Sequence, residues 1–253
     1  MNIPNPVRVV VAGATGKMGR EVVKAVTSTE DMELVGAVAL EHTGSDVGKV
    51  VGIQELGVHI ATEVVEVLDQ TKPHVLVDFT APKVAGRNTL AALERGVRAV
   101  VGTTAIPREE IERIVQHCES NGTAAAIIPN FCIGAVLLMK VAEEVAPFFD
   151  KAEIIELHHD QKLDAPSGTS LRIEERIAKG SSRRSPIHSI RLPGLVAHHE
   201  VIFGRPGETL ILRHDSINRE AFMPGVLKTI RKVMKTRGMI TNLEEVLFER
   251  EDT

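Results

Sequence analysis

Short runs of β-branched residues alternate with helical stretches over the first half of the chain, from Val7 to about Ile128. Apolar residues are continuous within the runs and recur with a period near 3.6 between them. Continuous apolar strands joined by helices are typical of a parallel sheet covered on both faces. Strands are expected at 7–11, 33–39, 75–79, 97–101 and 124–128, with helices ending near 26 and 93 and spanning about 107–118. The pattern predicts an α/β fold built on a Rossmann-like, doubly wound parallel sheet.

The pattern changes about half-way along the chain. A helix is predicted over 133–145, followed by a strand that ends in a histidine pair at 158–159 and by a short helix after Pro166. Residues 187–217 alternate polar and apolar positions without long helices between the runs, which is typical of an antiparallel sheet. The stretch 225–246 is again helical in pattern. A second domain of α+β type, with a mixed or antiparallel sheet, is therefore expected.

Composition and charge narrow the function classes. Of the 253 residues, 43% are hydrophobic and 25% are charged, as in soluble globular proteins. The net charge of −4 gives no overall positive field for a phosphate backbone, so nucleic acid is not an expected partner. The apolar run from Phe131 to Met139 is much shorter than the roughly 20 residues of a bilayer span, so no membrane segment is expected.

The cysteines and the amino terminus bear on the compartment. Cys118 and Cys132 have neither the spacing of a metal site nor a disulfide framework around them, so we interpret them as free thiols. The first residues, MNIPNPVRVVVAG, lack the basic segment and the small-residue cleavage site of a signal peptide. A cytoplasmic location is expected.

A glycine motif stands between the first strand and the first helix. In VVVAGATGKMGR, Gly13, Gly16 and Gly19 form a G-x-x-G-x-x-G variant of the dinucleotide fingerprint. Glycine allows a tight turn and lets a pyrophosphate approach the helix N-terminus, where free N–H groups favour an anion. A plain strand-to-helix turn would also use glycine, but the alternating β/α context favours a dinucleotide site.

Weaker signals follow the other strands. Glu41 is the nearest acidic residue to the end of the second strand, but it lies 28 residues after Gly13 rather than the usual ~20. It either binds the ribose hydroxyls or is an ordinary surface carboxylate. The segments 102–104 and 129–131 follow the fourth and fifth strands, at the edge where open α/β sheets bind ligands.

The stretch ELHHDQKLDAPSGT, residues 156–169, concentrates proton carriers. Successive strand residues point to opposite faces, so the two adjacent histidines do not converge on one metal ion, and no metal site is expected. A histidine can exchange a proton near neutral pH, and Lys162 adds a persistent positive charge. This combination suits the protonation of an anionic intermediate.

The same stretch contains a candidate anion site. Pro166 suits the start of a helix, and Ser167, Gly168 and Thr169 would place amides and hydroxyls at its N-terminus. A carboxylate substrate fits such a site, although a solvated polar loop would have the same residue types. A second pair, His198 and His199, is interpreted as strand residues that pack at a domain or subunit surface.

The chain resembles the dihydrodipicolinate reductase family, the 4-hydroxy-tetrahydrodipicolinate reductases of the diaminopimelate route to lysine. The most specific segment is ELHHDQKLDAPSGT, and the resemblance covers nearly the whole chain. The other segments, in the family's order, are GATGKMG, VDFTAP, VGTTA, IPNFCIG, RLPGLVAHHEVIFG and RHDSINREAFMPGV.

The resemblance implies a homotetramer of two-domain chains. Residues 1–129 and 221–253 would form the dinucleotide-binding domain, and residues 130–220 the substrate-binding and oligomerisation domain. NADPH or NADH would deliver a hydride to a cyclic imine that carries two carboxylates. His158 would be the general acid and Lys162 a second proton donor or charge stabiliser, with the substrate carboxylates held by His159, Lys162, Gly168 and Thr169.

The resemblance also implies the cofactor contacts. They would come from the glycine turn and from the ends of the fourth and fifth strands, beside the candidate ribose ligand Glu41. The residues are Gly13, Ala14, Thr15, Gly16, Lys17, Met18, Gly102, Thr103, Thr104, Ile128, Pro129, Asn130 and Phe131.

Three features depart from the family's pattern. The segment 178–187 is shorter by a couple of dozen residues, which affects loop order and subunit packing more than catalysis. Cys132 replaces the serine or alanine that is more usual after Asn-Phe. His42 stands where some members carry an arginine that pairs with a 2′-phosphate, so the choice between NADH and NADPH stays open.

Two other function classes remain. In a semialdehyde dehydrogenase, Cys132 would be a thiolate nucleophile with a histidine as its base, but this leaves HHDQKLDAPSGT without a role. A non-catalytic nucleotide-binding protein would have kept the fold without turnover. His158 and Lys162 argue against that reading.

Overall fold

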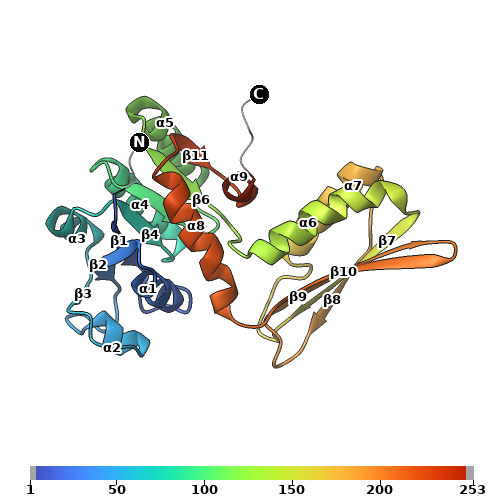
Figure 1. Ribbon diagram of the computed structural model, residues 1–253, viewed down its shortest axis with the longest axis horizontal. Helices are drawn as coiled ribbons and strands as arrows, with labels where there is room; N and C mark the ends of the chain where they lie inside the picture. The colour runs from blue at the N-terminus through green and yellow to red at the C-terminus, as the bar shows by residue number, and fades with distance from the viewer. Residues whose placement is uncertain (1–3, 249–253) are drawn as a thin grey trace. The chain divides into compact units, whose positions relative to one another are not determined.

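The structure, a computed structural model, describes residues 4–248, which form two compact units (Figure 1). The chain passes from the first unit to the second between Phe131 and Cys132, and returns to the first between Ala221 and Phe222. Each unit has its own sheet.

The first unit contains a seven-stranded sheet in the order β11-β6-β5-β4-β1-β2-β3, in which every pair of neighbours is parallel. Because strand order reverses between β1 and β4, the carboxyl ends of these strands form the edge where ligands bind in such folds. The strands are β1 (Val7–Ala12), β2 (Met32–Val38), β3 (Ile60–Ala61), β4 (Val75–Asp78), β5 (Arg98–Val101), β6 (Ala124–Ile127) and β11 (Gly238–Ile240). The helices are α1 (Gly19–Thr27), α2 (Val47–Val51), α3 (Val64–Thr71), α4 (Pro82–Leu93), α5 (Arg108–Asn121), α8 (Met223–Val233) and α9 (Glu244–Leu247).

The central strands β1, β4 and β5 are buried on both faces, as their continuous apolar sequence predicts. Val9, Val10 and Val11 alternate between the faces of β1, and all three have no exposed surface. One core cluster joins β1 and β4 to α3, and another joins β5 and β6 to α5 through Ile114. Each such side chain contributes about 1.5–3 kcal/mol when fully buried.

One sequence expectation for this unit is wrong, and three short elements were not predicted. The helical pattern of 225–246 predicted a continuous helix, but α8 ends at Val233 and Gly238 begins strand β11 with φ +88°. That backbone conformation favours glycine and is incompatible with a continuing helix. Residues 47–71 contain two helices and a short strand that periodicity did not predict, because segments of two to eight residues are too short to show a period.

The second unit contains a four-stranded sheet in the order β10-β9-β7-β8. β8 runs parallel to β7, whereas β9 is antiparallel to both of its neighbours, so the sheet is mixed. Its strands are β7 (Lys151–His158), β8 (Ile187–Arg191), β9 (Ala197–Arg205) and β10 (Glu208–Ser216), and its helices are α6 (Ile133–Val145) and α7 (Gly168–Ser181). Short 3-10 turns follow at Ala146–Phe148 and Arg219–Phe222.

Helix α7 differs from the short helix expected after Pro166. It has 14 residues and begins at Gly168, with Ser167 as its N-cap. The Ser167 hydroxyl accepts a hydrogen bond from the amide of Ser170 at 3.2 Å, which satisfies one of the free donors of the first turn. Pro166 therefore precedes the cap instead of occupying the first turn.

One face of this sheet packs against α6 and α7. Ala152 and Ile154 of β7 and Phe203 of β9 are buried on that face, together with Ile173 and Ile177 of α7. Alternate residues of the same strands point to the opposite face. Among the described residues of this unit, no helix packs on that opposite face.

Candidate active site

The glycine turn after β1 is held tightly against the neighbouring strands. Gly13 has φ +78°, and a Cβ at this position would lie 2.7 Å from the carbonyl oxygen of Phe79. Its amide donates to the carbonyl of Val38 at 2.9 Å. A Cβ on Gly19 would lie 2.0 Å from the Gly13 carbonyl oxygen, so α1 begins directly behind the turn. Both positions require glycine.

The predicted cofactor residues of this turn are partly open to solvent. Gly16 and Lys17 are exposed, whereas Ala14 is buried. Arg20, which the sequence did not single out, donates to the carbonyl of Thr15 at 2.8 Å and to that of Val50. The turn therefore presents amide groups at the start of α1 on a fixed backbone, which is the geometry that a pyrophosphate needs.

The segments after β4 and β5 contact each other. A Cβ on Gly102 would lie 2.0 Å from the Phe79 ring, so the ring packs directly on the Gly102 backbone. The hydroxyl of Thr103 donates to the carbonyl of Thr80 at 3.2 Å. Thr104 is exposed at the same strand end. The loop 79–81 after β4 thus lies beside two of the predicted cofactor segments, although sequence reasoning gave it no role.

The segment after β6 completes this edge of the sheet. Ile128 is buried, and its amide donates to the Val101 carbonyl at 3.0 Å. The rings of Phe131 and Phe79 lie 5.8 Å apart and are tilted by 52°. Pro129 and Asn130 are half-buried between these anchors.

Glu41 lies in the exposed loop that follows β2, next to β1 in the sheet. His42 in the same loop is exposed and has φ +61°. The predicted cofactor residues therefore all lie in segments that follow strands of one parallel sheet. These strands are β2, β1, β5 and β6, and β4 lies between β1 and β5.

In the second unit, His158 ends β7 with its ring buried. Glu156, two residues earlier, points to the same face and has no exposed surface. Its Oε2 contacts His158 Nδ1, and its Oε1 accepts from Arg191 Nη2 at 2.7 Å. Arg191 lies opposite His158 in the β7–β8 register and also donates to the Asp164 carbonyl at 2.7 Å. Glu156 thereby fixes the orientation of the His158 ring.

His199 of β9 lies beside this pair. It pairs with Glu156 in the antiparallel register, and its ring stands edge-on to that of His158 at 5.4 Å between centroids. Its Nε2 is 3.5 Å from the hydroxyl of Ser167, the N-cap of α7. The expectation that His199 packs at a surface is wrong, because it is 3% exposed. His198 does point to the uncovered face, where its Nδ1 contacts Asp215 at 2.7 Å.

Burial governs the protonation of both rings. Burial lowers the pKa of His158, the Glu156 carboxylate acts in the opposite direction, and the charges of Lys162 and Arg191 lower the pKa further. Burial and the neighbouring His158 lower the pKa of His199 to about 3, so His199 is neutral at physiological pH. Burial raises the pKa of Glu156, but hydrogen bonds from Arg191 and Ser189 outweigh this and keep it ionised.

The remaining predicted substrate residues lie between the end of β7 and the first turn of α7. Lys162 is held by Asp164, with Nζ–Oδ distances of 2.7 and 2.9 Å. His159 and Thr169 are half-buried, and Gly168 is exposed. No atom lies within 4 Å of the Cβ position of Gly168, so the space in front of the helix N-terminus is open. The α7 amides can therefore receive an anion.

Sequence reasoning gave Glu156 and Arg191 no role of their own and interpreted His199 as a packing residue, because the three side chains come from three different strands. Only Glu156 carried a local signal, the E-x-H spacing that places two side chains on one face of a strand. Arg191 and His199 join the site through strand register, which the sequence pattern does not specify.

The thiol of Cys132 also has a histidine partner. Its Sγ lies 3.3 Å from His214 Nε2 and 3.6 Å from the Ser216 hydroxyl. Burial opposes ionisation, but the hydrogen bonds from His214 and Ser216 lower the pKa of Cys132. In contrast, burial raises the pKa of the other free thiol, Cys118, to about 11.

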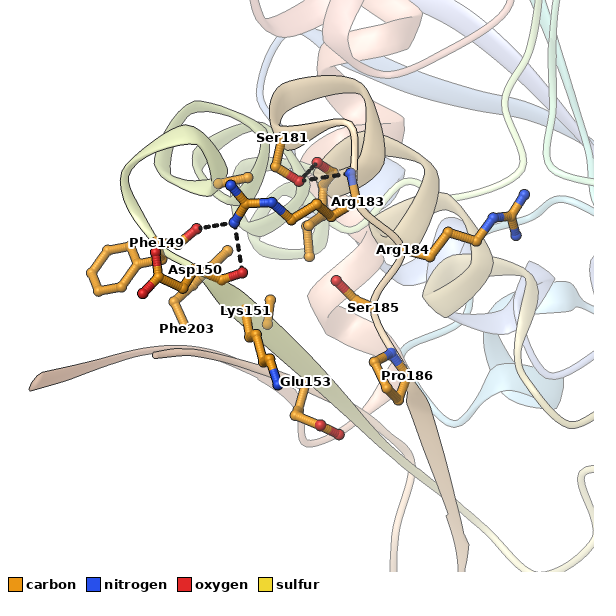
Figure 2. A pocket seen from close by; sticks show the side chains of 13 residues that line it. Phe149, Asp150, Lys151, Glu153, Ser181, Arg183, Arg184, Ser185, Pro186 and Phe203 are labelled. Atoms are coloured by element: carbon orange, nitrogen blue, oxygen red, sulfur yellow. Dashed lines mark hydrogen bonds between the residues drawn. The ribbon is translucent and has the colours of Figure 1, made fainter. Parts of the chain in front are cut away.

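A cavity of ≈ 370 Å³ lies at the opposite end of β7 from His158. Figure 2 shows Arg183 reaching back to the carbonyls of Phe149 and Asp150, with N–O distances of 3.0 and 2.6 Å. These bonds tie the segment after α7 to the start of β7. The cavity is separate from the histidine site.

No group of three or more His, Cys, Asp or Glu side chains is placed to hold a metal ion between residues 4 and 248. Within the same range, no helix combines the length and the apolar character needed to cross a membrane.

The fold and the site define a Rossmann-type oxidoreductase with a separate histidine-containing unit. Two family models match the chain: "Dihydrodipicolinate reductase, N-terminus" over residues 7–131 and "Dihydrodipicolinate reductase, C-terminus" over residues 134–247. The chain belongs to the dihydrodipicolinate reductase family.

Individual relatives agree with this assignment. The 4-hydroxy-tetrahydrodipicolinate reductase of Moorella thermoacetica is 44% identical over 95% of this chain and 98% of that protein. Its counterpart from Geobacillus thermodenitrificans is 42% identical over 95% of this chain and 99% of that protein. A solved structure, dipicolinate-bound dihydrodipicolinate reductase from Paenisporosarcina sp. TG-14, is 36% identical with a TM-score of 0.81, covering 94% of this chain and 98% of that one.

Proposed function

We propose that this protein reduces 4-hydroxy-tetrahydrodipicolinate with NADPH or NADH, as the names of its relatives indicate. The observation that carries the proposal is the Glu156–His158 pair beside the open N-terminus of α7. A proton donor thus lies next to an anion site, which suits the reduction of a cyclic imine that bears two carboxylates.

His158 supplies the proton. With Nδ1 held by Glu156, the Nε2 atom of the protonated ring is left to donate. Because the pKa of His158 is lowered in the free protein, the negative charge of an arriving dicarboxylate favours the protonated ring at the moment it is needed. Lys162 provides a second positive charge and stabilises the anion that forms.

The substrate carboxylates bind at the start of α7. The amides of Gly168 and Thr169 are free of intrahelical partners, and the Thr169 hydroxyl and His159 add further donors. The relative from Paenisporosarcina was solved with dipicolinate bound, which is a dicarboxylate of the same kind. A dicarboxylate inhibitor should therefore compete with the substrate here.

The residues of the parallel sheet fit a dinucleotide, because the glycine turn exposes amides at the start of α1 and leaves no side chain in the way. Gly13, Ala14, Thr15, Gly16, Lys17 and Met18 would hold the pyrophosphate, with the segments 102–104 and 128–131 alongside. A reduced nicotinamide supplies a hydride when it is bound. The protein orients the nicotinamide and excludes water from the site.

The test is oxidation of NADPH and of NADH in an assay coupled to fresh product of dihydrodipicolinate synthase. His158→Gln should lower kcat by about 10²- to 10⁴-fold, the usual contribution of a general acid, while nucleotide affinity stays unchanged. A variant that keeps more than half of the wild-type kcat would remove His158 from the role of acid.

A second candidate rests on the Cys132–His214 pair, which has the geometry of an activated thiol nucleophile. In that case the protein would use a covalent thioester as semialdehyde dehydrogenases do. Full activity of Cys132→Ser in the imine assay excludes this chemistry. A loss as large as that of His158→Gln would favour it.

We infer that the protein is a homotetramer, assembled through the uncovered face of its four-stranded sheet. Ile155, Leu157, Ile190 and Ile202 form an apolar centre on this face, and Arg213 belongs to a charged rim. An apolar centre with a polar rim is typical of subunit interfaces. We also place the protein in the cytoplasm, where its two free thiols are stable.

A further inference from the structure

The carboxylate of Asp78 stands at the carboxyl end of β4, where it is completely buried. Its Oδ1 accepts from the amide of Thr80 at 2.8 Å and from the Thr80 hydroxyl at 2.6 Å. Its Oδ2 accepts from the side-chain amide of Asn88, on α4, at 2.8 Å. A buried carboxylate costs several kcal/mol unless such donors surround it. The reduction proposed above gives the Asp78 carboxylate no role.

Asp78 determines the shape of the short loop 79–81. Both hydrogen bonds to Oδ1 come from Thr80, so they close the turn that leads from β4 into α4. The bond from Asn88 fixes the carboxylate from the opposite side. Burial raises the pKa of Asp78, and the bonds from Thr80 and Asn88 oppose this rise. The Asp78 carboxylate is therefore a buried acceptor that anchors the loop from the side of β4 and α4.

This loop supports three of the segments assigned to the dinucleotide. The Phe79 carbonyl occupies the place that a Cβ on Gly13 would need, and the Phe79 ring covers Gly102. The same ring packs against Phe131, and the Thr80 carbonyl accepts from Thr103. Any movement of the loop would thus displace the glycine turn and both neighbouring segments together.

We propose that Asp78 is a positioning residue for the dinucleotide site, acting through the Thr80 turn on the segments at Gly13, Gly102 and Phe131. The proposal rests on the proposed function of those segments. It concerns nucleotide affinity and alignment, and it assigns Asp78 no contact with the reacting atoms.

Two variants of Asp78 separate the hydrogen-bond acceptor from the charge. Asp78→Ala removes every acceptor for Thr80. Asp78→Asn keeps one oxygen for Thr80, and the Asn88 amide can rotate to accept from the new amide. The Kd values of NADPH and NADH are measured by isothermal titration calorimetry. Asp78→Ala should weaken both by about 10- to 100-fold, the worth of hydrogen bonds to a charged group, and Asp78→Asn should remain within about threefold of wild type.

Thr89 provides a matched control on the same helix. Its hydroxyl is also completely buried and donates to the Ala85 carbonyl at 2.7 Å, but within residues 4–248 it makes no hydrogen bond to the loop 79–81. Thr89→Ala should lower the melting temperature without changing either Kd. In turnover, Asp78→Ala should raise the nucleotide KM while inhibition by pyridine-2,6-dicarboxylate stays unchanged, because the anion site lies in the other unit.

The outcomes are distinct. Wild-type Kd values in Asp78→Ala, or an equal loss in Thr89→Ala, overturn the proposal. If Asp78→Ala does not fold, Asn88→Ala decides: weakened nucleotide binding with Thr89→Ala unaffected supports the role, and identical behaviour of the two overturns it. If the wild-type protein binds neither nucleotide, the assignment of the dinucleotide site itself is wrong and this proposal falls with it.

Discussion

At the residue scale, the proposed proton donor His158 contacts a carboxylate two positions earlier on its own strand. Glu156 holds His158 Nδ1 and is itself held by Arg191. The three side chains come together on the helix-covered face of the sheet. A histidine at the end of a strand becomes an oriented acid only through such a partner.

We expect Glu156→Gln to lower kcat by about 10- to 100-fold, the worth of a hydrogen bond to a charged group. The pH dependence of kcat/KM should also change, and the direction of the change can be stated. A general acid loses activity as pH rises through its pKa, and the Glu156 charge raises the pKa of His158. Removing that charge lowers this pKa, so the falling limb of kcat/KM should move to lower pH.

The matched control is Glu153→Gln on the same strand. Glu153 is exposed and contacts His188, and it points away from the helix-covered face. Its kinetics should match wild type. An unshifted limb in Glu156→Gln would show that Glu156 does not act on the protonation of His158.

We also expect single residues to decide the choice between NADH and NADPH. Glu41 is exposed after β2, and it would accept hydrogen bonds from the ribose of NADH and repel the 2′-phosphate of NADPH. Lys17 and His42 compensate only in part, so we expect kcat/KM for the two nucleotides to agree within about tenfold. Glu41→Ala should shift the ratio toward NADPH, measured at low and high salt, with NADPH the more salt-sensitive.

Glu66→Ala on α3 is the control for that shift, because Glu66 is an exposed carboxylate of the same unit outside the proposed site. Its nucleotide ratio should equal that of wild type. A ratio that Glu41→Ala leaves unmoved would mean that Glu41 faces solvent and that another residue reads the ribose.

At the element scale, the loops after the parallel strands act as one assembly. The ring of Phe79 lies against Gly102 on one side and Phe131 on another. Since interiors are closely packed, a ring held on two sides has little room to move. Position 102 therefore has room for glycine but not for a residue with a side chain.

Gly102→Ala should destabilise the protein by about 1–3 kcal/mol, the usual cost of overpacking, and should raise the KM of both nucleotides. Its Cβ would lie 2.0 Å from the Phe79 ring. Thermal unfolding and initial-rate kinetics measure the two effects. Gly204→Ala is the control, because no atom lies within 4 Å of that Cβ position. Equal behaviour of the two variants would contradict this account of Gly102.

At the scale of the whole molecule, one face of the sheet in the second unit has no covering helix among the described residues of that unit. β-sheets with an apolar stripe are normally buried against another layer, and α6 and α7 supply it on one side only. A second copy of the chain would supply the other. The apolar stripe at Ile155, Leu157 and Ile202 is the surface that assembly would bury.

Ile202→Glu should dissociate the proposed tetramer, because unpaired charges at the centre of an interface are strongly unfavourable. Sedimentation velocity at micromolar concentration measures the change. Val65→Glu on α3, where the side chain is 41% exposed, is the control and should sediment like wild type. Wild-type sedimentation of Ile202→Glu would move the interface to another surface.

The sequence predicted much of this architecture. The alternation of apolar runs and helical periods predicted the Rossmann-like sheet, and the sequence motifs predicted the family; both predictions are confirmed. Gly13 and Gly19 predicted the turn, because no other residue fits the backbone at these two positions. Such features are local, so a few neighbouring residues specify them.

Only the tertiary structure decided which distant residues meet. Arg191 reaches Glu156 through the parallel register of β8 with β7, and His199 does so through the antiparallel register of β9. Strand β11 was not predicted, because it forms by pairing with β6, a segment more than a hundred residues away in the sequence. Periodicity shows which face of a strand is buried, whereas partner and register depend on packing across the whole sheet.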